Sequence, residues 1–61
     1  MIKIGSLVRY NSRLLLALEE QPDGHGYTDG WWRCSEIGTN RIRIYDPKQL
    51  AVVMTEEEFY L

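Results

Sequence analysis

The 61-residue sequence predicts an all-β protein, a small antiparallel barrel of five short strands. Short runs rich in β-branched and aromatic residues recur between turn-forming residues, as is typical of small all-β domains. The segment RIRIYD at 41–46 alternates apolar and polar residues with the period of a strand. The segment PKQL at 47–50 begins with a proline and has the composition of a 3₁₀ turn ahead of the last strand.

The first half of the chain contains two strand-like segments and a long loop. SLVRY at 6–10 predicts a strand, and NSR at 11–13 predicts the turn that follows it. LLLALEE at 14–20 has the composition of a helix, but it is too short to form a stable isolated helix, and we interpret it as a strand. That strand places three leucines on one face: Leu14, Leu16 and Leu18. QPDGHGYTDG at 21–30 contains Pro22 and two Asp-Gly pairs and predicts a loop.

The second half begins with WWRCSEI at 31–37, which predicts a strand. GTN at 38–40 predicts a tight hairpin turn, because glycine and asparagine tolerate a positive φ. The strand at 41–46 and the 3₁₀ turn at 47–50 follow, and AVVMT at 51–55 predicts the last strand. We therefore expect a single barrel over 1–55 and an acidic and aromatic tail over 56–61.

Alternation along the expected strands predicts which side chains form the core. Trp32 and Cys34 share one face of their strand, and we place Ile42 and Ile44 beside them. The full predicted core is Leu7 or Val8, Leu14, Leu16, Leu18, Trp32, Cys34, Ile42, Ile44, Leu50, and Val52 or Val53.

Composition excludes several classes of protein. A single cysteine, Cys34, cannot form a disulfide within the chain, and together with one histidine it cannot complete a structural zinc site. The net charge of −2 supplies no basic excess for binding nucleic acid. The longest apolar run, LLLAL, is too short to cross a membrane, and no signal peptide is recognisable at the N-terminus. We expect no cofactor and no contact with a membrane.

Three segments together resemble the small SH3-like barrel proteins of tailed bacteriophages. They are KIGSLVRY, GWWRC and RIRIYDPKQLAVV, and the resemblance covers about residues 3–53. It implies an SH3-like barrel, a phage-encoded protein, and a location in the host cytoplasm or the virion. Related barrels of the KOW type favour a glycine where the second strand bends, and LLLALEE has none.

Two candidate chemical sites have simpler interpretations. Cys34 alternates with Trp32, which predicts a buried thiol rather than a nucleophile. Asp23, His25 and Asp29 have metal-binding side chains, but aspartate and glycine also occur in such loops because they form turns. We therefore expect no catalytic residue, no metal site and no enzymatic activity.

The candidate binding surface follows from the same alternation. If Trp32, Cys34 and the two isoleucines face the core, one outer face collects Trp31, Arg33, Arg41, Arg43 and Tyr45. Tryptophan, tyrosine and arginine are enriched at protein-binding hot spots, which predicts docking onto a larger virion or host protein. The same residue types also stack on single-stranded nucleic acid, although the acidic chain disfavours this, and they also occur on plain solvated faces.

The tail is a second candidate contact. Three glutamates precede Phe59, Tyr60 and Leu61. These apolar residues either pack across the end of their own barrel or insert into a neighbouring subunit, so a homo-oligomer is one of the expected states.

Overall fold

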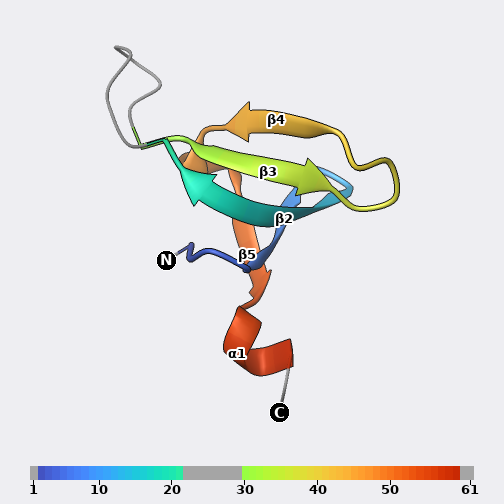
Figure 1. The fold of residues 1–61 in the computed structure, drawn as a ribbon, viewed down its shortest axis with the longest axis vertical. Coiled ribbons are helices and arrows are strands. Elements are labelled where there is room, and N and C mark those ends of the chain that lie inside the picture. Colours follow the sequence, from blue (N-terminus) through green and yellow to red (C-terminus); the bar gives the residue numbers. More distant parts are fainter. Residues whose placement is uncertain (1, 22–29, 60–61) are drawn as a thin grey trace.

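The computed structural model describes residues 2–21 and 30–59, except for the side chain of Phe59 (Figure 1). The elements in chain order are β1 (Leu7–Tyr10), β2 (Arg13–Glu20), β3 (Trp32–Glu36), β4 (Ile42–Tyr45), η2 (Pro47–Gln49), β5 (Ala51–Met54) and α1 (Glu56–Phe59). The all-β class and the 3₁₀ turn before the last strand are confirmed. The segment 14–20 is a strand, as predicted, and a short helix begins the expected tail.

The strands form one five-stranded antiparallel sheet in the order β4-β3-β2-β1-β5. Figure 1 shows β2, β3 and β4 side by side, with β5 running steeply across behind them. β4 and β5 are the two edge strands, so the sheet is not closed, and the predicted barrel is not confirmed.

Residues with a positive φ shape the hairpins. Asn11, with a φ of 55°, lies between the paired ends of β1 and β2. Gly38 and Asn40, with φ values of 105° and 62°, turn the chain from β3 into β4. The Glu36 N–H donates to the Arg41 carbonyl, so residues 37–40 form the turn and fix the register of β4. Glycine and asparagine occupy this left-handed region at the lowest cost.

β2 bends without a glycine. Its pairing with β3 shifts between Ala17 and Glu19, so Leu18 is an extra residue opposite none of the β3 residues. A β-bulge of this kind bends a strand and increases its twist. The bend of β2 is therefore produced by an additional residue and not by a glycine.

On three strands, the core contains different side chains from those predicted. The buried apolar residues are Val8, Leu15, Ala17, Trp32, Cys34 and Tyr45, with Ile2, Tyr10 and Leu50 packed against them. Trp32, Cys34, Val8 and the contact of Leu50 agree with the prediction. The predicted burial of Leu14, Leu16, Leu18, Ile42, Ile44 and the two valines is wrong, because none of these side chains is buried.

Volume explains the reversed faces. Inside the curved sheet, the small side chains Ala17 and Cys34 face each other across β2 and β3. Trp32 lies opposite Tyr45 at the next pair of β3 and β4, and these rings fill the remaining space. A cluster of leucines and isoleucines on the same side would overfill so narrow an interior.

The segment before β1 packs against the C-terminal helix. Gly5 has a φ of +87°, and a Cβ atom there would approach the Glu56 carboxylate to 3.0 Å. Ser6 is fully buried, and its hydroxyl accepts a hydrogen bond of 3.0 Å from the Lys3 N–H. The positive φ of Gly5 and the full burial of Ser6 explain why two small residues precede β1.

Candidate interaction face

The structure does not bring the five residues of the predicted docking face together. Arg33 lies opposite Ile44, whereas Arg43 lies opposite Cys34 and Tyr45 lies opposite Trp32. Opposite residues of an antiparallel pair project to the same side, so Arg33 faces outward while Arg43 and Tyr45 face inward. Tyr45 is only 8% exposed and belongs to the core. The prediction of one shared outer face is therefore wrong.

Arg41 and Trp31 complete the predicted set. Arg41 is exposed and, by alternation with Arg43, lies on the inner side of the β4 edge. Trp31 directly precedes β3 and is half-buried, and its carbonyl accepts a hydrogen bond of 2.7 Å from the Gln21 N–H. Arg41 thus lies on the other side of the sheet from Arg33.

The outer side of β2, β3 and β4 carries aliphatic side chains instead. Leu16, Ser35 and Ile42 form one row across the three strands, and Glu19, Arg33 and Ile44 form the next. Leu14 and Ile37 extend the surface at the end where the Ile37 N–H donates to the Leu14 carbonyl. We call this surface the outer aliphatic face, and it comprises Leu14, Leu16, Ile37, Ile42 and Ile44.

These side chains are open to solvent. The exposed fractions are 43% for Leu14, 54% for Ile37, 58% for Ile42 and 39% for Ile44. Ser35 and Arg33 of β3 lie between the aliphatic residues of β2 and those of β4, so the face consists of two apolar margins on either side of a polar strand. Several large apolar side chains exposed on one side of a small domain are typical of an interaction site.

One ion pair interrupts the outer aliphatic face. The Arg33 guanidinium (Nη1) lies 2.8 Å from the Glu19 carboxylate (Oε1), and both side chains are about half exposed. The register shift after Ala17 brings Glu19 opposite Arg33. The face is therefore apolar at its margins and carries one balanced pair of charges between β2 and β3.

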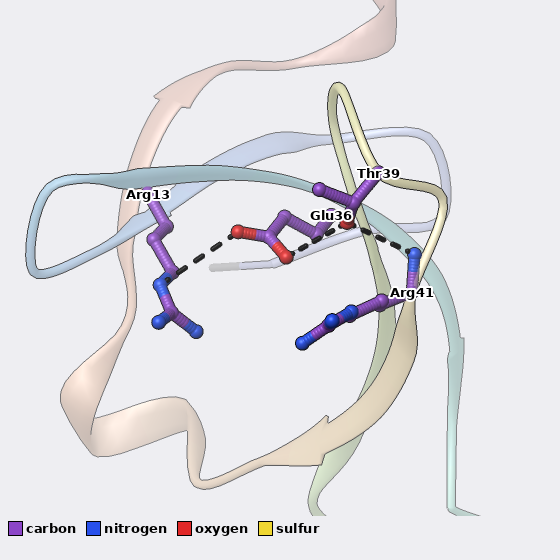
Figure 2. Close-up of polar contacts among 4 residues, drawn as sticks. All are labelled: Arg13, Glu36, Thr39 and Arg41. Atoms are coloured by element: carbon purple, nitrogen blue, oxygen red, sulfur yellow. Dashed lines mark hydrogen bonds and ion pairs between the residues drawn. The ribbon is translucent and has the colours of Figure 1, made fainter.

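A polar cluster lies on the inner side of the sheet, at the end of β2 and β3 that is farther from the Glu19–Arg33 ion pair (Figure 2). The Glu36 carboxylate accepts a hydrogen bond of 2.8 Å from the Thr39 hydroxyl and lies 3.7 Å from Nε of Arg13. The Thr39 hydroxyl in turn accepts a hydrogen bond of 3.3 Å from the Arg41 N–H. Glu36 thus joins the start of β2 to the β3–β4 turn, while the Arg13 and Arg41 guanidinium groups lie on either side of it.

Two tyrosines lie on the same inner side as these arginines. The rings of Tyr10 on β1 and Tyr45 on β4 are 5.2 Å apart and tilted by 54°. This contact joins strands that are not neighbours in the sheet and shows how far the sheet curls. Together with Arg13, Arg41 and Arg43, the rings form a basic and aromatic margin along β4.

An open groove lies at the other end of the core. Its volume is about 550 Å³, and it is lined by Ile2, Glu20, Gly30, Trp32, Pro47, Leu50 and Val52. Glu20 lies opposite Trp32, on the inner side of the sheet. The groove is thus separate from the outer aliphatic face and lies on the other surface of the same strands.

The predicted burial of Cys34 is confirmed. Its side chain is fully buried, and burial raises the pKa of the thiol to about 11, because the thiolate would lose its hydration. The thiol lies 3.8 Å from the Trp32 carbonyl. Since a thiol with so high a pKa stays protonated, this position favours a packing role over a nucleophilic one.

Some predicted residues lie outside the part of the chain that the structure describes. These are the loop residues Asp23, His25 and Asp29, the tail residues Tyr60 and Leu61, and the side chain of Phe59. Within residues 2–21 and 30–59, no three side chains of histidine, cysteine, aspartate or glutamate gather in a metal-binding arrangement. In the same ranges, no helix has the length and hydropathy needed to cross a bilayer.

The chain matches no protein-family model, no curated protein and no solved structure. The candidate site therefore rests on the geometry of the chain itself.

The sequence contains a signal for the outer aliphatic face that alternation alone does not reveal. In LLLAL, both faces of one strand carry apolar residues. Whichever face is buried in the core, the other face is therefore also apolar and points away from the core. Such a strand is expected where a sheet is covered on both sides. Here only one side is covered by the described residues of this chain.

Proposed function

We propose that this chain is a non-enzymatic protein-interaction module that docks through its outer aliphatic face. The observation that carries the proposal is the exposure of Leu14 on β2, Ile37 in the β3–β4 turn, and Ile42 and Ile44 on β4, all on the outer side of the sheet. A partner with a complementary apolar surface would remove these side chains from water, which contributes roughly 25 cal/mol per Å² of apolar area. The balanced pair of Glu19 and Arg33 would then supply orientation rather than net attraction.

We further propose that the fold is an SH3-like barrel of the type carried by tailed bacteriophages, with a larger virion or host protein among the possible partners. The 3₁₀ turn η2 ahead of β5 and the ring contact between Tyr10 and Tyr45 support this proposal. The second of these brings β1 and β4 toward each other, as closure of a small barrel requires.

Site-specific photo-crosslinking in cells tests the docking function. A benzophenone amino acid at position 42 lies on the outer aliphatic face, whereas one at position 48 replaces an exposed lysine of η2. We expect covalent adducts with protein from position 42 and none from the matched control at position 48. Absence of adducts from position 42, or equal adducts from both positions, would contradict the proposal.

A second candidate function is binding of single-stranded nucleic acid by the basic and aromatic margin. The observation that favours it is the gathering of Arg13, Arg41 and Arg43 on the inner side with the Tyr10 and Tyr45 rings. The acidic net charge of −2 opposes it. This function requires an affinity that falls steeply with salt and that drops in the double variant Arg41→Ala, Arg43→Ala. Fluorescence anisotropy with a labelled oligonucleotide measures both effects.

A further inference from the structure

We propose that the occupant of the outer aliphatic face is a second copy of this chain, packed face to face about a twofold axis. The inference rests on the proposed docking function, because it names the partner of that same face. The outer sides of β2, β3 and β4 from two copies would then form the two layers of a sandwich, with the sheets roughly 10 Å apart.

The charges on the face favour a second copy. Glu19 and Arg33 lie side by side, 2.8 Å apart, and are both about half exposed. A twofold interface places the same patch on both subunits. If residue i of the first copy contacts residue j of the second, residue j of the first copy therefore also contacts residue i of the second. Arg33 of each copy would meet Glu19 of the other copy, so these two charges would stay paired at the interface. A patch that carries one charge of each sign is complementary to itself.

The edge of the sheet disfavours the alternative in which two copies join strand to strand. An antiparallel pair of β4 strands about a twofold axis, centred on Arg43, would place the two Arg43 side chains directly opposite each other. Like charges opposite one another destabilise a pair of strands, and charged side chains on an edge strand discourage such pairing. Charge therefore disfavours association through the β4 edge.

The small core gives the chain a reason to associate. Within residues 2–21 and 30–59, the largest fully buried side chains are those of Leu15, Val8, Cys34 and Ser6. A domain of this length buries only about 60% of the surface of its unfolded chain, and association is one of the usual ways in which small domains gain stability. A second copy would convert the exposed aliphatic residues into a second core.

Sedimentation equilibrium of the full chain tests the inference through charge reversal. We expect the apparent molecular mass of the wild type to rise from that of one chain to that of two chains as its concentration rises from micromolar to millimolar. Glu19→Arg and Arg33→Glu each create a face of one sign, so each variant alone should associate at least about tenfold more weakly. An equimolar mixture of the two variants should recover a dimer, because each face then complements the other.

The control separates this outcome from a loss of folding. Each reversal replaces an exposed ion pair within the chain by two like charges that solvent screens, so circular dichroism should show both variants folded. Ile42→Ser should weaken association, whereas Ile4→Ser, at an exposed isoleucine outside the face, should not.

Two results would overturn the inference. One is a wild-type mass of a single chain at every concentration, and the other is association of both charge-reversed variants that is as strong as that of the wild type. If the wild type stays monomeric while position 42 still crosslinks to another protein, the docking function stands and the second copy is wrong. If position 42 crosslinks to nothing, both proposals fail.

Discussion

The inner and outer sides of β2, β3 and β4 are both apolar, yet they differ in how their side chains fill space. The inner side combines small residues, Ala17 and Cys34, with the rings of Trp32 and Tyr45. The outer side carries leucines and isoleucines of similar size around one ion pair. The curved interior requires large and small side chains to alternate, whereas a flatter outer surface accepts uniform aliphatic ones. Side-chain hydrophobicity alone therefore does not identify the core side of this sheet. The variation in side-chain volume between neighbouring positions does.

Trp32→Ala is expected to have the largest effect, because it removes the main ring of the inner side. The substitution should lower the free energy of unfolding by about 3–5 kcal/mol, which is comparable with the whole stability of so small a domain. Thermal unfolding followed by circular dichroism should show no cooperative transition. A cooperative transition close to that of the wild type would contradict the placement of Trp32 in the core.

Leu15→Ala and Leu14→Ala form a matched pair that tests the two sides at adjacent positions. Leu15 is fully buried and Leu14 is 43% exposed. Leu15→Ala should therefore lower the free energy of unfolding by about 2–5 kcal/mol. Leu14→Ala should lower it by about 0.5 kcal/mol or less, measured on the dilute chain. Urea denaturation measures both values, and the opposite order would show that the outer side is the true core.

Cys34 provides a chemical test of the inner side. Burial raises the pKa of its thiol from 9.0 to about 11, so the protonated form is favoured in the folded chain. The folded state binds this proton more tightly, so the stability it contributes is present below pH 9.0 and declines as the pH rises toward about 11. Iodoacetamide at pH 8 should alkylate the native thiol far more slowly than the thiol in urea, as measured by mass spectrometry. Equal rates would place Cys34 at the surface.

Glu58 is expected to have the smallest effect, confined to the start of α1. Its carboxylate accepts a hydrogen bond of 2.7 Å from the Thr55 N–H and a second from the Thr55 hydroxyl, which lowers its pKa. The contact is present above the usual carboxyl pKa and is lost as the pH falls through the lowered value. Glu58→Gln should reduce this pH dependence. The protection factor of the Thr55 amide, which is the ratio of the intrinsic exchange rate to its observed rate at the same pH, should decrease at acidic pH in the wild type when measured by NMR. An unchanged protection factor would contradict the cap.

The capping contact between Thr55 and Glu58 could have been predicted from the sequence. TEEE at 55–58 has the spacing of a capping box, in which the first threonine and the last glutamate satisfy each other's helix-end groups. Read as a charge run, the same letters predict only a solvated tail. The helix was therefore recognisable from spacing, but not from composition.

Local chemistry was sufficient to predict the strands and the turns. Asn11, Gly38 and Asn40 stand where a positive φ is required, and Asp46 caps the 3₁₀ turn through the Lys48 N–H. These preferences depend on a few neighbouring residues, so they can be recognised in a sequence before any tertiary contact is known. The bend of β2 was not predictable in this way, because a bulge is a property of the pairing between two strands.

The sequence by itself determined that each strand has two faces, that both faces of 14–18 are apolar, and that Trp32 and Cys34 share a side. Only the tertiary structure decided which faces point inward. In β4 that choice depends on the number of residues in the turn at 37–40, because one residue more or less would move Tyr45 outward and Ile44 inward. In β2 it depends on the rings supplied by β3 and β4, which occupy the interior and leave the leucines Leu14 and Leu16 on the side where a partner can reach them.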